Sequence, residues 1–163
     1  MKKLLSITLT TLLVLFASQA FGQSADVEVS AEVEGSLSIE NQEDTQFGTI
    51  QAGQSHTISN EERTDDLGRV FIEGQANTTI FFNTEGSIDL EGPDGSEDIE
   101  ATLSYYGATS NDIGQASTLE NDDELSDDGE YYIFVGAFLD LPNDQANGTY
   151  SGNTTIEVSY TSF

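Results

Sequence analysis

The clearest pattern in the chain is a strict alternation of small or apolar residues with polar residues near the N-terminus. From residue 25 to residue 39 the odd positions are small or apolar, ending at Leu37 and Ile39, and nearly every even position is polar or charged. Period two places all odd side chains on one face of an extended strand, whereas a helix would scatter them around its circumference. The pattern predicts one long strand, or two strands joined at Gly35, with one dry face.

Similar segments follow at short intervals, separated by turn residues. Strands are expected over 56–58, 69–73, 78–82, 88–90, 99–105, 131–138 and 150–160, with turns at 74–77 and 92–95. Residues 131–138 are apolar at both parities, which predicts a central strand covered on each side. About eight strands without an amphipathic helix predict an all-β fold, an antiparallel immunoglobulin-like β-sandwich, with a closed barrel as second choice.

The stretch between residues 109 and 129 interrupts this pattern. It is rich in Asp and Glu, and its few sizeable apolar residues have no period. We interpret it as a long acidic loop that is either mobile or held by a cation. The chain has no internal repeat and no second block of composition, which predicts one sandwich domain over residues 23–163.

The first 22 residues are typical of a secretory signal peptide. Lys2 and Lys3 precede the apolar run Leu4–Phe16, and small residues follow at the spacing of a cleavage site. The apolar run is shorter than the roughly 20 residues of a membrane span, which favours a cleaved signal over a retained anchor. The prediction is an exported protein without a transmembrane anchor, located in the periplasm, at the cell surface or outside the cell.

The charge of the chain is strongly negative. It has 30 acidic residues against four basic ones, a formal net charge of −26. Removal of Lys2 and Lys3 with the signal leaves 2 − 30 = −28, because only Arg63 and Arg69 remain as bases. Such a surface repels phosphate and excludes nucleic acid as a partner. It suits a halophilic protein whose carboxylates are screened by salt, and the alternative is that the carboxylates bind divalent cations.

The residues that commonly perform catalysis are scarce. The chain has no Cys and one His, which excludes disulfides, thiolate metal sites and multi-histidine metal sites. His56 lies between Ser55 and Thr57 in an expected strand, where we expect it to be exposed, and no serine lies in a G-x-S-x-G motif. The chain has no Trp to line a sugar cleft. We therefore predict no enzymatic activity, no catalytic residue and no organic cofactor.

Calcium is the one cofactor that the sequence leaves open. Hard oxygen ligands from short loops suit Ca²⁺, and solvated surface is the alternative for each group. The acidic residues that cluster in this way are Asp94, Glu97, Asp98, Asp122, Asp123, Asp127 and Asp128.

Four segments in order carry a resemblance to a known family. They are the alternating N-terminal strand, residues 47–50 with Gly53 after them, residues 134–139, and the closing run from Gly148 to Tyr160. Together they resemble a domain-of-unknown-function family of small secreted bacterial β-sandwich proteins. That family is similar in outline to spore coat protein U and to pilin-like subunits.

The resemblance implies a structural role at the cell surface, with no known active site, and a periplasmic chaperone and an usher as partners. Its signature residues are expected to have structural roles, in which a glycine allows a turn or close packing and a tyrosine buries its ring. These residues are Phe47, Gly48, Gly136, Tyr150, Gly152 and Tyr160.

Two functions remain open from the sequence. The first is a pilin-like or coat-like, fimbrial or adhesive subunit that assembles with itself or with other surface subunits by β-strand exchange. Its donor strand would present Ala25, Val27, Val29, Ala31 and Val33, although these residues equally suit the first strand of their own fold. The second is a monomeric module that binds carbohydrate or calcium, suggested by the acidic loop and by Tyr105, Tyr106, Tyr131 and Tyr132.

Overall fold

The computed structural model describes residues 35–163. The predicted signal peptide, the start of the predicted domain at residue 23 and the apolar positions from Ala25 to Val33 lie outside the described residues. Residues Glu34–Phe163 group into one compact unit. Within the described part of the chain, no helix is long and apolar enough to cross a bilayer.

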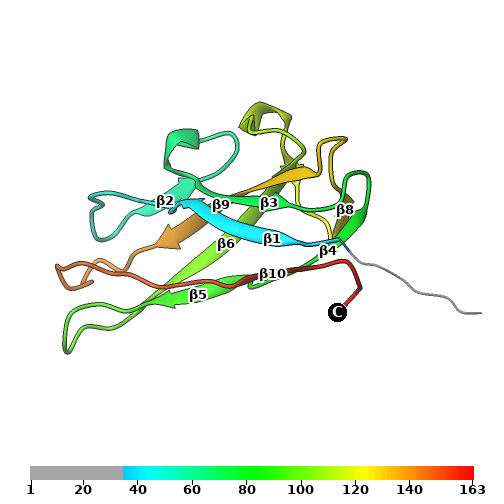
Figure 1. Ribbon diagram of the computed structural model, residues 1–163. Coiled ribbons are helices and arrows are strands. Elements are labelled where there is room, and N and C mark those ends of the chain that lie inside the picture. The colour runs from blue at the N-terminus through cyan, green and yellow to red at the C-terminus, as the bar shows by residue number, and fades with distance from the viewer. Residues whose placement is uncertain (1–34) are drawn as a thin grey trace, which may run out of the picture. The chain divides into compact units, whose positions relative to one another are not determined.

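Between residues 35 and 163 the chain forms two antiparallel sheets, which agrees with the predicted all-β sandwich (Figure 1). The larger sheet has the order β1 (Ser38–Glu43), β3 (Gly68–Glu73), β9 (Glu130–Asp140), β6 (Ile99–Ala108) and β5 (Ser87–Leu90). In this sheet β2 (Ser55–Ile58) also pairs with β9, and β7 (Ser117–Thr118) pairs with β6. The smaller sheet has the order β10 (Ile156–Ser159), β4 (Thr79–Thr84) and β8 (Asp122–Glu124). Two short 3-10 helices, η1 (Thr64–Asp66) and η2 (Ile113–Gln115), lie in the connections.

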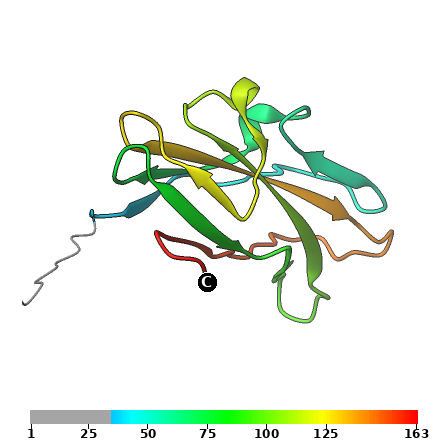
Figure 2. The same ribbon diagram turned by 90° about the vertical axis from the view of Figure 1, so that its right-hand side faces the viewer.

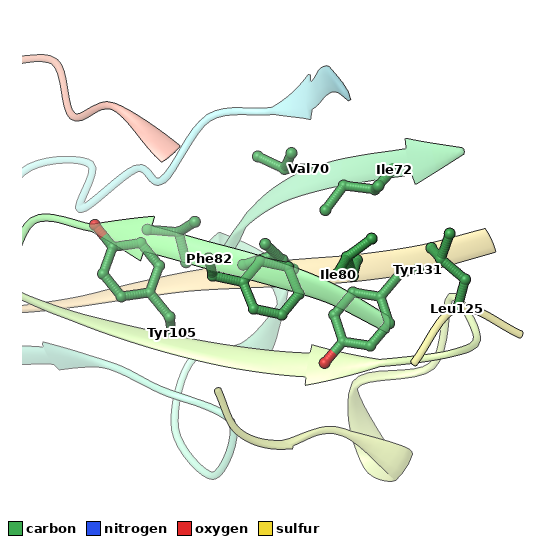
Figure 3. Close-up of a cluster of buried hydrophobic side chains, with 9 residues drawn as sticks. Val70, Ile72, Ile80, Phe82, Tyr105, Leu125 and Tyr131 are labelled. Carbon is green, nitrogen blue, oxygen red and sulfur yellow. The ribbon is translucent and has the colours of Figure 1, made fainter. Parts of the chain in front are cut away.

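The main hydrophobic core lies between the two sheets. From the side shown in Figure 2, β4 and β8 lie across the long strands of the larger sheet. Figure 3 shows the ring of Phe82 between those of Tyr105 and Tyr131. Burial of each large apolar side chain stabilises the fold by about 1.5–3 kcal/mol. The buried members of this core are Val70, Ile72, Ile80, Phe82, Tyr105, Leu125, Tyr131, Ile133 and Val135.

A second apolar cluster covers the outer face of the larger sheet. Ile58 of β2 and Leu67 after η1 pack there against Phe134 of β9 and Ala108 of β6. The strand β9 is therefore covered on both faces, and it pairs with β3 on one side and with β6 on the other. This confirms the central position that its apolar residues at both parities predict.

The other predicted strands agree with the observed ones in location. The expected strands over 56–58, 69–73, 78–82, 88–90 and 99–105 correspond to β2, β3, β4, β5 and β6. The expected turns at 74–77 and 92–95 also occur, and in them Asn77 and Gly95 have positive φ values of 54° and 83°. In the first strand, only Leu37 and Ile39 of the predicted apolar face lie within the described residues.

The prediction of one long loop between residues 109 and 129 is wrong. This stretch contains η2, β7 and β8. The acidic strand β8 pairs with β4, so that Thr79 faces Glu124, and Leu125 directly after it is fully buried in the main core. Backbone hydrogen bonds and one anchoring leucine form this strand, although its own side chains have no apolar alternation.

The C-terminal strand is shorter than predicted. Alternation extends from residue 150 to residue 160, but β10 includes only Ile156–Ser159. Ile156 faces Thr84, the last residue of β4, so the residues before Ile156 extend beyond the end of their partner strand. They form one isolated bridge instead, between Ser151 and Glu91.

Candidate functional site

A groove of about 1020 Å³ enters the sandwich between β1 and the C-terminal segment. One wall consists of β1 and the residues up to Ala52, and the other consists of residues 145–156, which lead into β10. In Figure 1, β1 and β10 run in opposite directions. The floor is the inward face of β5, β6 and β9, with the side chains of Leu90, Ile99, Ala101, Leu103, Ala137 and Leu139.

The lining of the groove is almost free of charge. Among the described side chains that line it, only Glu43 and the adjacent Asp44 are charged. The chain as a whole has 30 acidic residues, so an ordinary surface of this protein would be far more acidic. A large hollow with an apolar floor and few charged side chains indicates a binding surface.

The wall that follows β1 is held by several contacts. Thr45 Oγ1 donates a hydrogen bond of 2.8 Å to the carbonyl oxygen of Val135. Phe47 packs against two apolar clusters, and Arg63 both lies 5.9 Å from its ring centroid and donates to its carbonyl oxygen. Gly48 has a φ of 67°, a left-handed conformation that favours glycine and turns the chain after Phe47.

Tyr150 fixes the opposite wall. Its hydroxyl donates to the carbonyl oxygen of Ala146 at 3.0 Å and accepts from Gln145 Nε2 at 2.8 Å. The same amide nitrogen of Gln145 donates to the carbonyl oxygen of Glu97. The Tyr150 ring packs so closely on Gly92 that a Cβ at that glycine would overlap it. These contacts attach the wall to the connection between β5 and β6.

The strands at the mouth of the groove have free edges. Within residues 35–163, β1 pairs only with β3, and β10 pairs only with β4. Ile39 lies on the same side of β1 as Leu37, which packs against the core, yet 44% of Ile39 is exposed. An uncovered apolar side chain beside unpaired backbone N–H and C=O groups is what an added strand requires.

The N-terminal end of β1 is attached to the C-terminal end of β10. The Tyr160 hydroxyl donates to the Ser36 carbonyl oxygen at 3.2 Å and accepts from the Gln75 backbone N–H at 2.7 Å. Gly35 packs against the Gln75 side chain and does not have a left-handed φ. The chain therefore enters β1 without a glycine turn at residue 35.

A smaller hollow of about 460 Å³ is lined by residues of the β4–β5 connection, β6 and β7. Tyr105, at its side, donates from its hydroxyl to the Glu85 carbonyl oxygen at 2.9 Å and lies 3.1 Å from Thr154 Oγ1. Burial raises the pKa of Tyr105, and the hydrogen bond to Thr154 opposes this change in part. Thr154 also donates to the Glu85 carboxylate. These polar groups thus satisfy one another in a structural network.

The family described as a domain of unknown function (DUF4402) matches residues 20–160. The chain belongs to the DUF4402 family. No curated protein matches it in sequence. Family membership supports the predicted resemblance to a domain-of-unknown-function family, whereas the likeness to spore coat protein U and pilin-like subunits stays a prediction.

In this DUF4402 chain, the six signature residues have structural contacts. Four of them line the groove, namely Phe47, Gly48, Tyr150 and Gly152. The Tyr160 hydroxyl donates to the Ser36 carbonyl oxygen and so joins the end of β10 to the start of β1. A Cβ at Gly136 would overlap the Ile58 carbonyl oxygen. Because the β6–β9 ladder continues through Gly136 without a shift in register, this glycine allows close packing and does not form a bulge.

The walls of the groove have a signal in the sequence that the strand pattern does not reveal. Residues 45–60 and residues 145–156 contain no Asp, Glu, Lys or Arg. These uncharged stretches supply most of the two walls. Their uncharged composition in so acidic a chain could have identified the groove, but the hollow between them requires the three-dimensional fold.

The predicted calcium ligands fall on separate segments. Asp94, Glu97 and Asp98 lie between β5 and β6, Asp122 and Asp123 lie on β8, and Asp127 and Asp128 lie before β9. The Asp123 carboxylate accepts hydrogen bonds from the Tyr131 hydroxyl at 2.7 Å and from the Glu124 N–H at 2.8 Å. In the part of the chain that the structure describes, no group of three or more acidic or histidine side chains is arranged to hold a metal ion. Calcium binding stays a prediction.

His56 differs from its predicted exposure. It is half-buried on β2 opposite Leu139 of β9, and its Nε2 is buried without a hydrogen-bond partner. The partial burial follows from the pairing of β2 with the central strand β9, which the short polar sequence of β2 did not predict.

The tyrosines that suggested a carbohydrate platform divide into two groups. Tyr105 and Tyr131 are buried in the main core, which contradicts the idea that they are exposed. Tyr106 and Tyr132 are half-buried on the outer face, where the Tyr132 ring lies 5.1 Å from that of Phe71 between centroids. Burial and the neighbouring Glu130 raise the pKa of Tyr132.

Proposed function

We propose that this protein is an exported, non-enzymatic structural or adhesive subunit that assembles at the cell surface by β-strand exchange. The observation that carries the proposal is the groove with its apolar floor and few charges beside β1 and β10, whose outer edges are free within residues 35–163. A strand added at such an edge gains affinity from backbone hydrogen bonds and specificity from alternate side chains that enter pockets. The predicted donor strand, residues 25–33, has the required alternation.

Export supports the same proposal. A groove of this kind would expose apolar surface and unpaired backbone groups while the protein crosses the periplasm, and such edges favour aggregation. A periplasmic chaperone that covers the groove, together with an usher, would solve this problem. We propose these two proteins as transient partners and the cell surface as the final location.

The proposal is tested by electron microscopy and size-exclusion chromatography of the purified mature chain. The wild-type protein is expected to form polymers, and deletion of residues 25–33 is expected to abolish them. A gentler variant is Val29→Asp, which places a charge on the apolar face of the donor strand and should also abolish polymers. Glu28→Gln, on the other face, is the matched control and should retain them. A wild-type chain that stays monomeric over a wide range of protein and salt concentrations would contradict the proposal.

A second candidate function rests on the outer face. The half-buried pair Phe71 and Tyr132, whose rings are tilted by 41°, lies beside Arg69 of β3, and aromatic rings next to polar groups suit carbohydrate. A monomeric carbohydrate- or calcium-binding module is thus the alternative. Binding of an oligosaccharide that Tyr132→Ala abolishes, in a chain that stays monomeric, would favour this module over the structural subunit.

A further inference from the structure

We infer that the groove between β1 and β10 is the acceptor site for residues Ala25–Val33 of a second copy of this chain. The inference rests on the proposed function and adds the edge that pairs, the side chains that enter the groove and the source of the strand. Residues 25–33 of one copy would lie along the floor of the groove in the next copy and pair with the free edge of β1. Their five odd-numbered side chains would point to the floor.

The dimensions of the groove suit this occupant. Nine extended residues span about 30 Å and present alternate side chains to one face. All five inward side chains would be Ala or Val, which are small enough to pack on a floor that already holds Leu90, Leu103 and Leu139. The occupant would cover Ile39, the inward-facing side chain of β1 that is left 44% exposed.

The distribution of charge fits the same segment. The groove offers no cation for an acidic or anionic ligand, because Glu43 and Asp44 are the charged residues of its described lining. The predicted donor strand has its acids, Asp26, Glu28 and Glu32, on the face opposite its apolar side chains. When the apolar face lies in the groove, these carboxylates remain in water. No charge is then buried, so the large desolvation cost of a buried carboxylate is avoided.

The geometry at the start of β1 favours a second copy over the same chain as the source of the strand. To fill the groove beside its own β1, the segment ending at Val33 would have to reverse direction within a tight hairpin loop. That loop would have to form within the four residues between Val33 and β1. The Ser36 carbonyl oxygen accepts a hydrogen bond from the Tyr160 hydroxyl, and Leu37 packs against the main core, so both are held on the path that leads into β1. A strand from a neighbouring copy needs no such reversal.

Disulfide mapping in the full mature chain tests the inference, because the natural chain has no cysteine. One variant carries Ile39→Cys at the mouth of the groove. Each member of a second set carries one cysteine at position 25, 27, 29, 31 or 33. Mixing the first variant with each of the second set under mild oxidation should give a disulfide-linked heterodimer at one or two neighbouring positions of the apolar face. The controls are Glu40→Cys, on the outer side of β1, and Glu28→Cys, on the polar face of the donor, and neither should cross-link.

The outcomes separate the possible occupants. Cross-links between different copies support the inference. A double variant with Ile39→Cys and a donor cysteine tests the same chain as the source of the strand. If this variant cross-links only within one chain, and the mixed single variants do not cross-link, the groove is filled by its own chain and the inference is overturned. Polymers that form without any of these cross-links also overturn it, although the proposed structural function then stands. If neither polymers nor cross-links form, the proposed function fails as well.

A matched pair of charge substitutions gives a second readout. Ile39→Glu places a carboxylate where the incoming strand must lie, and is expected to reduce the polymerised fraction by at least about tenfold. Ile39 is already partly exposed, so the melting temperature of the monomer should change little. Phe138→Glu is the control, because Phe138 is similarly exposed, at 41%, on the outward side of β9 and away from the groove. Equal loss of polymers in both variants would contradict the assignment of the groove.

Discussion

At the scale of single residues, tyrosine hydroxyls join parts of the sandwich that are distant in the sequence. Tyr131 donates to the Asp123 carboxylate, Tyr105 to the Glu85 carbonyl oxygen, and Tyr160 to the Ser36 carbonyl oxygen. Each ring packs in or against the core while its hydroxyl reaches a polar group near the surface. A buried ring with a satisfied hydroxyl stabilises both packing and register.

Because of Tyr131, the free energy of unfolding is expected to decrease at alkaline pH. Burial, and then the hydrogen bond to Asp123, raise the pKa of Tyr131 above the ordinary value of 10.0. The folded state therefore keeps the phenol proton more strongly than the unfolded state. The stability that this proton contributes is complete below about pH 10 and is lost as the pH rises further, by up to about 1.4 kcal/mol per pH unit.

The measurement is urea unfolding at a series of pH values from about 8 to 11. Above pH 10 the free energy of unfolding of the wild type should fall, and Tyr131→Phe should reduce this slope. It should not remove the slope, because the pKa of Tyr105 is raised as well. At neutral pH the variant should lose about 1 kcal/mol with its hydrogen bond. An identical slope in the two proteins would contradict the role of Tyr131.

Gly136 provides a test of close packing around the central strand. Gly136→Ala would place a Cβ against the Ile58 carbonyl oxygen, a backbone atom that cannot move without shifting β2. We expect a loss of about 1–3 kcal/mol in the free energy of unfolding, typical of an overpacked core. The control is Gly86→Ala, since a Cβ at Gly86 meets nothing within 4 Å. Chemical denaturation of both variants decides, and equal stabilities would be the contrary result.

The sequence indicated structural roles for Tyr150 and Tyr160 but did not identify the groups that they contact. Tyr150 and Tyr160 were expected to bury their rings and to direct their hydroxyls to backbone or water; both residues are half-buried, and their hydroxyls donate to the carbonyl oxygens of Ala146 and Ser36. The partner of Tyr160, however, is 124 positions away in the chain. Local patterns give the preference of a residue for burial, whereas contacts at this distance depend on how the sheets pack.

At the scale of elements, the least expected feature is the acidic edge strand β8. Its residues Asp122–Glu124 are all exposed, and none contributes an apolar side chain. The strand exists because β4 offers it backbone partners, because Leu125 anchors its C-terminal end, and because Asp123 in its middle accepts a hydrogen bond from Tyr131. Within the described residues, strands with apolar alternation were predicted in the right places, although β10 is shorter than its alternation suggests. The strands β7 and β8, which form at edges through backbone pairing, were not predicted.

Leu125 is therefore the expected anchor of β8. Its side chain is 1% exposed and packs in the main core. Leu125→Ala should reduce the free energy of unfolding by about 2–5 kcal/mol through lost burial and a residual cavity. Amide hydrogen exchange at residues 122–124 should accelerate more than exchange in β9. Leu119→Ala, at a half-buried position next to the same core, is the milder comparison, and a smaller effect for Leu125 than for Leu119 would contradict this anchor.

At the scale of the whole molecule, the chain is strongly acidic, but the groove between β1 and the C-terminal segment is lined by few charged residues. Both arginines of the described residues are paired with carboxylates, Arg63 with Asp66 and Arg69 with Glu43. The many remaining carboxylates repel one another, and this repulsion destabilises the compact state. The groove is the exception, because its two walls come from uncharged stretches. Under the proposed assembly, the groove is the surface where contact between two copies would bring the fewest carboxylates together.

Assembly should consequently depend on salt. Under the proposed strand exchange, two copies of a chain with a formal net charge of −26 repel one another as they approach. Because the Debye length falls from about 10 Å at 0.1 M salt to about 3 Å at 1 M, sodium chloride should increase both the rate of polymer formation and the free energy of unfolding. Light scattering and urea unfolding across this range measure the two effects.

Calcium chloride at matched ionic strength separates screening from binding. If the carboxylates act only through their general repulsion, sodium and calcium salts of equal ionic strength should increase stability and assembly to a similar extent. If the acidic residues around Asp94 or Asp127 bind the ion, calcium should act at millimolar concentrations where sodium has no effect. The variants Asp94→Asn and Asp127→Asn should then each remove the contribution of its own segment. Polymerisation that decreases as sodium chloride is raised would contradict the view that repulsion between copies limits assembly.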